Sequence, residues 1–484
     1  MNEPEKIPHT EIPAEQLAPA EVGELDLYQR REKIYTRSIE GFFQRLRLYT
    51  GWPLLLGYFL LPWLNWGDRQ AVLFDLPARK FYILGLTFWP QDFPLLAWLL
   101  IIAAWSLFAV TVFAGRVWCG YTCPQTVWTA IFMWAEQIAE GSRNQRIKLD
   151  KAPWSANKIG RKLLKHGMWI GFAFATGITF IGYFSPMREL LPNTFTLDIS
   201  LMEAAWITFF TCATYINAGW MREQVCLYMC PYARFQSVMF DRDTLIVSYD
   251  AARGEPRGAR KNILHKTQNN GDPETSSLGD CIDCKICVQV CPTGIDIRDG
   301  LQYQCINCAL CIDGCDSVMD KMGYPRGLIR YTTENLLEGK PYRWLRPRLI
   351  GYGIGVLVMV GLFIFTLSTR VPLRVDILRE RDHLYRQTSD GLVENTYTLR
   401  VINMDEQPHR YRIASSGLEN STLTGPTTIA VDGGDVKELA LRITIDPALL
   451  ESTRTPIIFA VENEDNPHQH IKVETGFFGP RTRR

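Results

Sequence analysis

Five long apolar stretches constrain the fold of this 484-residue chain more than any other feature. They cover residues 49–66, 94–115, 168–186, 200–217 and 349–368. A bilayer core of about 30 Å requires roughly 20 apolar residues in a helix, and each stretch reaches or approaches that length. The sequence therefore predicts an α-helical membrane domain of five transmembrane helices that interacts with lipid.

The distribution of Lys and Arg predicts the orientation of these helices. Basic residues are frequent before the first stretch and between the second and third, and they are rare in the two opposite loops. Because cytoplasmic loops are enriched in Lys and Arg, the N-terminus is predicted to be cytoplasmic and the C-terminus periplasmic. The 52 basic residues are balanced by 51 acidic ones. This balance gives no indication of nucleic-acid binding.

Eight of the 13 cysteines lie in two motifs, CIDCKICVQVCP and CINCALCIDGC. Each motif has the spacing C-x2-C-x2-C-x3-C, which is typical of bacterial ferredoxins with two [4Fe–4S] clusters. In such proteins the last cysteine of one motif binds the cluster of the other motif. Zinc binding is the alternative, but the order of the ligands favours iron–sulfur clusters. The predicted ligands are Cys281, Cys284, Cys287 and Cys315 for cluster one, and Cys305, Cys308, Cys311 and Cys291 for cluster two.

Four further cysteines form two matching pairs in WCGYTCPQ and VCLYMCPY, after the second and fourth apolar stretches. Residues four apart share one face of a helix, so Cys119 is expected beside Cys123, and Cys226 beside Cys230. The proline after each pair is expected to end or kink its helix. Because both preceding spans run inward, all four thiols are predicted at the cytoplasmic surface. Thiolates favour Cu(I), zinc or iron–sulfur clusters, whereas the alternative is that these cysteines only fill space.

The region after the fifth apolar stretch has a different pattern, with short alternating runs separated by Asn, Asp, Gly and Pro. The runs TYTLRVI, LALRITI and IIFAV place apolar residues at every second position. Such runs predict the strands of a β-sandwich of Ig-like architecture. This region has no cysteine and no cluster of catalytic residues, so a partner-docking role is expected.

These patterns predict a multi-domain chain. Residues 1–48 form a cytosolic N-terminal tail, and residues 49–240 form a four-helix membrane domain with both Cys-x3-Cys-Pro motifs. Residues 241–348 form a linker and a 2[4Fe–4S] ferredoxin-like domain. Residues 349–369 form the fifth transmembrane helix, and residues 370–484 form the periplasmic Ig-like sandwich. In the outer loop between the first two spans, the aromatic segment FYILGLTFWPQDF is expected to lie on the outer leaflet.

Five segments in chain order resemble the cytochrome c oxidase accessory proteins called CcoG, FixG or RdxA. They are GLTFWPQDF, WCGYTCPQTVW, ARGEPRG, GDCIDCKICVQVCPTGIDIRDGLQYQCINCALCIDGCD and MGYPRGLIRYTTE. The resemblance implies a multi-pass polyferredoxin of the bacterial inner membrane that serves the assembly of cbb3-type cytochrome oxidase. It further implies reduction of Cu(II) to Cu(I), which makes this an oxidoreductase. The family's Cys-x3-Cys-Pro motifs map to Cys119 and Cys123 and to Cys226 and Cys230, as catalytic and transient copper ligands.

The partners implied by this resemblance are oxidase assembly factors, or copper chaperones or transporters. An electron donor is also required, which the sequence does not identify, and a homodimer is compatible with the pattern. Two other functions stay open. One is a quinol-linked membrane ferredoxin that passes electrons to another reductase, which would not need the outer sandwich. The other is a non-catalytic assembly scaffold, whose cluster-ligand variants would keep their function.

Overall fold

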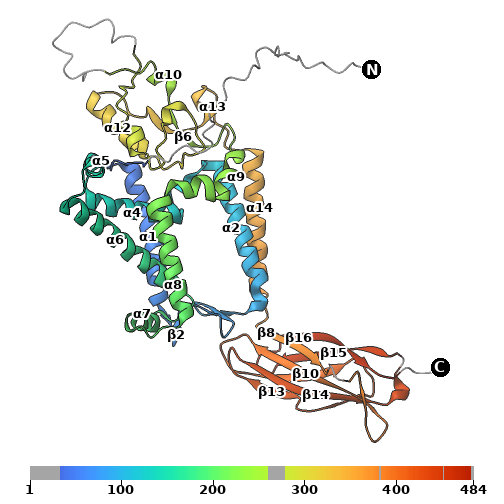
Figure 1. Cartoon of the computed structure of the whole chain (residues 1–484). Helices are drawn as coiled ribbons and strands as arrows, with labels where there is room; N and C mark the ends of the chain where they lie inside the picture. The colour runs from blue at the N-terminus through green and yellow to red at the C-terminus, as the bar shows by residue number, and fades with distance from the viewer. Residues whose placement is uncertain (1–32, 260–277, 381–382, 451, 481–484) are drawn as a thin grey trace, which may run out of the picture.

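The computed structural model describes residues 33–259, 278–380, 383–450 and 452–480. A cysteine-rich module lies at one end, helices fill the middle and a β-sandwich lies at the other end (Figure 1). Residues 1–32 of the predicted N-terminal tail and residues 260–277 of the predicted linker lie outside the described residues.

Two long apolar helices connect the two ends of the molecule. α2 (Phe93–Ala114) and α14 (Pro347–Ser368) lie side by side, and the ring centroids of Trp105 and Tyr352 are 5.6 Å apart. Each helix has a proline in its first turn, where the missing N–H costs no hydrogen bond. Among the described residues, only the segments Pro90–Ala114 and Pro347–Ser368 are by themselves long and apolar enough to cross a membrane.

Helices also occupy the other three apolar stretches, but none passes the same test alone. α1 (Phe42–Leu60) and α6 (Ala156–Ile181) begin in polar, basic sequence before the apolar part. α7 (Met187–Thr196) and the segment Leu201–Met221 pass only as a pair, with a bend of 92° between them. By length and composition, the described residues therefore contain two spans, or three if the bent pair is one span.

Short elements join these helices. α3 (Val117–Tyr121), α4 (Pro124–Glu140) and α5 (Arg143–Lys151) follow α2. α8 (Leu201–Thr214) continues into two π-helical segments, η4 (Tyr215–Met221) and η5 (Val225–Met229), and then into α9 (Pro231–Met239). The chain therefore leaves both apolar stretches through broken helices, and each break holds one of the Cys-x3-Cys-Pro motifs.

The cysteine-rich module comprises the described residues between β6 (Ile246–Tyr249) and β7 (Ile329–Thr332), which pair antiparallel and close it. Within it lie α10 (Ala251–Gly254), α11 (Ile286–Val290), η8 (Ile297–Asp299) and α12 (Leu310–Met322), and α13 (Glu334–Leu337) follows β7. The Asp313 carboxylate of α12 accepts hydrogen bonds from the backbone N–H groups of Phe43 and Gln44, at 3.2 and 2.8 Å. A carboxylate at a helix N-terminus is stabilising, so α12 holds the start of α1.

The C-terminal region forms two antiparallel sheets, ordered β12-β14-β10-β8, with β9 beside β10, and β13-β11-β15-β16. The strands are β8 (Leu373–Arg379), β9 (Arg386–Gln387), β10 (Val393–Asn403), β11 (His409–Ser416), β12 (Thr422–Thr424), β13 (Thr428–Val431), β14 (Val436–Ile445), β15 (Arg454–Asn463) and β16 (His470–Phe478). A turn, η9 (Pro447–Leu449), joins β14 to β15. Tyr397, Leu441 and Phe459 are fully buried between the sheets. The predicted alternation of buried and exposed residues is confirmed.

The outer loop folds into short strands, and the placement of its aromatic segment on the outer leaflet stays a prediction. After η2 (Leu61–Trp63) it forms the pair β1 (Asn65–Trp66) and β2 (Arg69–Gln70) and the sheet β3 (Val72–Asp75), β4 (Lys80–Ile83) and β5 (Leu86–Phe88). Trp89, just before η3 (Pro90–Asp92), is buried against Ile402 and Met404 of the sandwich. Its aromatic side chain therefore packs on protein and anchors the sandwich to the start of α2.

Replacement of Leu441 by Ala tests the sandwich core. Leu441 is fully buried and Leu449 is 49% exposed. Leu441→Ala should therefore lower the free energy of unfolding of the sandwich by about 2–5 kcal/mol, because it leaves a cavity. Leu449→Ala should change it by less than about 0.5 kcal/mol. Protease sensitivity of the sandwich in the intact protein across a urea series measures both. Equal losses of unfolding free energy in the two variants would contradict the placement of Leu441 in the core.

Candidate metal centre

The two C-x2-C-x2-C-x3-C motifs have the same backbone conformation. The residue before the second cysteine is left-handed in both, with φ of 52° at Asp283 and 52° at Asn307. The residue after it is left-handed too, with φ of 56° at Lys285 and 60° at Ala309. Non-glycine residues seldom adopt this conformation, and strain of this kind is concentrated at functional sites. Both loops therefore wrap around a centre in the same way.

The thiols of the two motifs fall into the two predicted sets. The Cys315 thiol interacts electrostatically with Cys281, Cys284 and Cys287, whereas Cys291 acts on Cys305, Cys308 and Cys311. The last cysteine of each motif thus lies with the other motif, as iron–sulfur ligation of this type requires. The individual ligand assignments stay a prediction.

Burial raises the pKa of five of the eight thiols, with members in each set. It raises the pKa of Cys287, Cys305 and Cys315 to about 12. Metal ligation needs thiolates, so a bound cation must displace these protons. Cys284 is the exposed member of the two sets. The donor set fits two [4Fe–4S] clusters because it offers eight cysteine thiols, none in a disulfide, on two equivalent loops.

The Cys-x3-Cys-Pro motifs do not lie on single helix faces, and this corrects the expectation from their spacing. Cys119 lies in α3 and Cys226 in η5, but Cys123 and Cys230 are the N-cap residues of the next helices, α4 and α9. The proline that follows each N-cap is the first residue of a new helix, where its fixed φ is favourable. The two motifs therefore share a broken-helix geometry, in which the second cysteine starts a helix.

The four thiols of these motifs are brought together, and we call them the four-thiol site: Cys119, Cys123, Cys226 and Cys230. Cys226 interacts electrostatically with Cys119 and Cys123, and Cys123 interacts with Cys230. Burial, reinforced by these neighbours, raises the pKa of Cys226 to about 11. Among the described residues, no three or more His, Cys, Asp or Glu side chains are already arranged to hold a metal ion. An ion bound here would have to draw the thiols together.

The four-thiol site touches the second cluster loop through Gly120. A Cβ atom on Gly120 would lie 2.7 Å from the carbonyl oxygen of Ile306 and 2.9 Å from Cα of Cys308, both backbone atoms. Any side chain at position 120 would therefore separate the two loops. The neighbouring Cys119 packs in the same apolar cluster as Cys308 and Cys311. The sequence did not predict this contact, because the two motifs differ at this position. The second motif has Leu227 where the first has Gly120, so the comparison of the motifs gave the glycine no special role.

Arg116 lies between the two groups of sulfur atoms and was also missed by sequence reasoning. Its side chain is buried, and it interacts electrostatically with Cys119, Cys305 and Cys226. It donates to the carbonyl oxygens of Ala233, at 2.7 Å, and Cys305, at 3.5 Å. Burial lowers the pKa of Arg116, but arginine keeps its charge in proteins. Arg116 therefore places a positive charge beside Cys305, a predicted ligand of cluster two.

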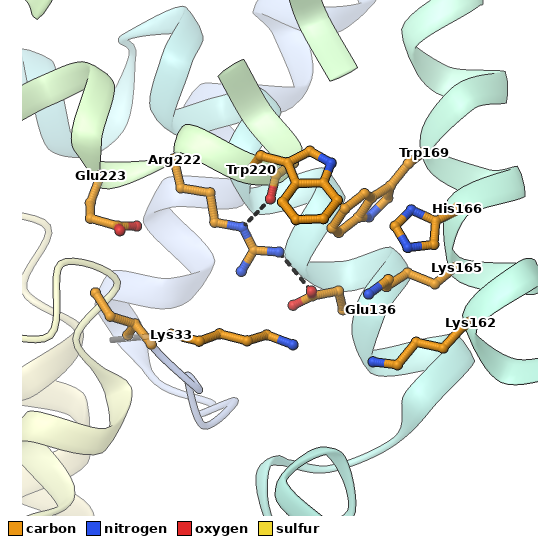
Figure 2. Close-up of a pocket in the computed structure, with 11 residues that line it drawn as sticks. Lys33, Glu136, Lys162, Lys165, His166, Trp169, Trp220, Arg222 and Glu223 are labelled. Carbon is orange, nitrogen blue, oxygen red and sulfur yellow. Dashed lines mark hydrogen bonds and ion pairs between the residues drawn. The ribbon is translucent and has the colours of Figure 1, made fainter. Parts of the chain in front are cut away.

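A buried ion network holds the second Cys-x3-Cys-Pro motif in place. Arg222 lies 2.7 Å from the Glu136 carboxylate (Figure 2). Arg146 lies 3.0 Å from the other oxygen of this carboxylate. Burial opposes ionisation, but the Arg222 guanidinium keeps the pKa of Glu136 below its usual value. Arg222 has a left-handed φ of 45° and comes four residues before Cys226. The pair therefore fixes where η5 begins, because breaking a buried ion pair is costly.

Three family models match the chain. One described as a 4Fe-4S dicluster domain covers residues 221–334, which include both cluster motifs. Another, described as a 4Fe-4S binding domain, covers residues 95–148. The third, described as the IG-like fold at the C-terminal of FixG, covers residues 363–480. These matches support the iron–sulfur and Ig-like predictions.

Known proteins match over most of the chain. Nitrogen fixation protein FixG of Rhizobium meliloti is 38% identical over 416 residues, which are 78% of each chain. Protein RdxB of Cereibacter sphaeroides is 41% identical over 397 residues, 78% of this chain and 80% of its own. A crystal structure of a FixG-related protein from Vibrio parahaemolyticus is 36% identical, covers 22% of this chain and 95% of its own, and has a TM-score of 0.21.

Removal of the positive charge at Arg116 should make cluster two harder to reduce. The reduced cluster carries one more negative charge, which the guanidinium stabilises. For Arg116→Gln we expect a reduction potential lower by about 59 mV, which is a tenfold change for one electron. EPR-monitored potentiometry measures it. The exposed Arg45, changed to Gln, is the control and should leave the potential unchanged. An unaltered reduction potential of cluster two in Arg116→Gln would contradict the placement of Arg116 beside this cluster.

Proposed function

Because the chain belongs to the FixG family of iron–sulfur proteins, we propose that it is an electron-transfer protein that reduces Cu(II) to Cu(I). Electrons pass through two [4Fe–4S] clusters to the four-thiol site, where copper is the substrate. The reduced copper is then delivered for the assembly of a cbb3-type cytochrome oxidase.

One observation carries this proposal, the backbone contact of Gly120 with Ile306 and Cys308. It supports a continuous path, since the residue after Cys119 meets the loop that would hold cluster two. In this proposal cluster one is the outer centre, because its predicted ligand Cys284 is exposed. From the protein surface inward, the order of the three centres is therefore cluster one, cluster two and the four-thiol site.

The chemistry of the four-thiol site supports copper as the acceptor. Cu(II) prefers nitrogen and oxygen ligands in tetragonal geometry, whereas thiolates select Cu(I). Thiols that hold Cu(I) better than Cu(II) also favour the reduction itself. Burial raises the pKa of Cys119 to about 12. Because a thiol has to lose its proton to become a ligand, the binding of Cu(I) here has to release protons.

The proposal places the protein in the bacterial inner membrane with several spans. The cysteine-rich module and the sandwich lie at opposite ends of α2 and α14 (Figure 1). The excess of basic residues before α1 and between α2 and α6 supports a cytoplasmic N-terminus and cysteine-rich module. The sandwich is then periplasmic, where it can dock copper-handling or oxidase-assembly partners.

Two alternatives keep the two clusters but leave out the reduction of copper. A membrane ferredoxin would pass electrons from cluster two to another reductase, and a scaffold would use its clusters for structure alone. Residues 95–148 match a 4Fe-4S binding domain, and the cysteines of this segment are Cys119 and Cys123. This match introduces a further alternative, in which the four-thiol site holds a third iron–sulfur cluster instead of copper. Two clusters correspond to about eight iron atoms per chain, and a third would give about twelve.

Replacement of Cys226 and Cys230 by Ala tests the copper site. We expect the iron content to stay at about eight per chain, because these thiols are not cluster ligands in this account. Bound copper and the rate of Cu(II) reduction should fall at least about tenfold, because two of the four soft ligands are lost. Metal analysis and a Cu(I)-chelator absorbance assay on anaerobically purified protein measure both.

The control is Cys212→Ala. Cys212 is an exposed cysteine of α8 outside both motifs, so its loss should leave copper and iron unchanged. Unaltered copper binding and reduction in the double variant would reject the four-thiol site as the copper site. A loss of about four iron atoms from the double variant would instead indicate a third cluster.

A further inference from the structure

A cavity of about 520 Å³ lies between α1 and α4 and reaches α6. Its volume is in the range of binding sites for small organic molecules. On one side it is lined by large apolar groups, including Leu55, Phe59 and Phe172. On the other side it is lined by amide side chains, Gln44 and Gln137. The cavity therefore suits a molecule with a long apolar part and a small polar head.

Part of the cavity wall adjoins the predicted ligands of cluster two. Val290 and Leu310 line the cavity, and each is followed directly by a predicted cluster-two ligand, Cys291 or Cys311. Gly120, which touches the backbone of Cys308, lines it as well. A redox-active head bound at this side would therefore lie against the residues that surround cluster two.

The guanidinium groups inside the cavity are not free to hold an anionic head. Three arginines line the cavity; Arg37 is exposed to solvent, and the other two already have partners. Arg47 donates to the carbonyl oxygen of Gly120 at 3.1 Å, and Arg146 pairs with Glu136 at 3.0 Å. A phospholipid phosphate would compete with these contacts, whereas a neutral hydroxyl or carbonyl can bond to the amide of Gln44 or Gln137.

We propose that this cavity binds an isoprenoid quinol, and that the quinol is the electron donor to cluster two. The inference rests on the proposed function, for which it supplies the missing donor. Oxidation of one quinol to the quinone releases two electrons and two protons. Each [4Fe–4S] cluster accepts one electron, so the two clusters together take both, and both electrons then leave through cluster two, each to reduce one Cu(II) to Cu(I). The protons pass to water at the exposed contact between Ser38 and Gln137.

Photolabelling and stopped-flow spectroscopy test this site in the intact protein. An azido derivative of decylubiquinone should label peptides of α1 and α4, and excess decylubiquinone should abolish the label while phosphatidylglycerol vesicles do not. Anaerobic decylubiquinol should also bleach the cluster absorbance. Ala130 lines the cavity, so Ala130→Phe should slow the bleaching at least tenfold and weaken the label.

The matched control is Ala104→Phe, on the exposed face of α2, which should bleach at the rate of the unchanged protein. Dithionite should reduce the clusters of both variants to the same extent, which establishes that Ala130→Phe is folded and loaded. Label displaced by phosphatidylglycerol, or equal bleaching in both variants, would overturn the quinol site. If quinol reduces the clusters but dithionite-reduced protein leaves Cu(II) unreduced, the donor site stands and the copper proposal fails.

Discussion

The absence of a side chain at residue 120 is the constraint on which the account of this protein depends. Gly120 allows the backbone of one Cys-x3-Cys-Pro motif to rest on the backbone of the loop that contains Ile306 and Cys308. At this contact there is no room for water or lipid between the two backbones. Arg116 adds a buried positive charge at the same place. The four-thiol site and the second cluster loop therefore share one electrostatic environment.

The rest of the fold keeps this contact in register. Asp313 caps α1 and so ties the cysteine-rich module to the helices, while the buried pair of Glu136 and Arg222 fixes the start of the segment that carries Cys226. At the other end, Trp89 packs on Ile402 and Met404 and joins the sandwich to α2. Conformational freedom is thus low at both ends of the two apolar helices, which suits a chain that has to hold separate redox centres at fixed distances.

Features set by local spacing could be predicted from the sequence, and features set by distant contacts could not. The period-two burial of Tyr397, Leu441 and Phe459 follows from strand geometry. The i, i+4 argument for Cys119 and Cys123 was wrong because Pro124 starts a new helix. Nothing local to Gly120 or Arg116 indicates the loop that each one meets some 190 residues further along the chain. The five-span prediction used hydropathy alone, and within the described part of the chain only the segments Pro90–Ala114 and Pro347–Ser368 meet that criterion by themselves.

The most direct test of the account is a single-turnover experiment on the anaerobic protein. The clusters are reduced with dithionite, excess reductant is removed, and one equivalent of Cu(II) is added while EPR follows both metals. The account predicts that the Cu(II) signal disappears as one reduced cluster per copper becomes oxidised, with Cu(I) retained by the protein. A Cu(II) signal that persists beside clusters that stay reduced would contradict it.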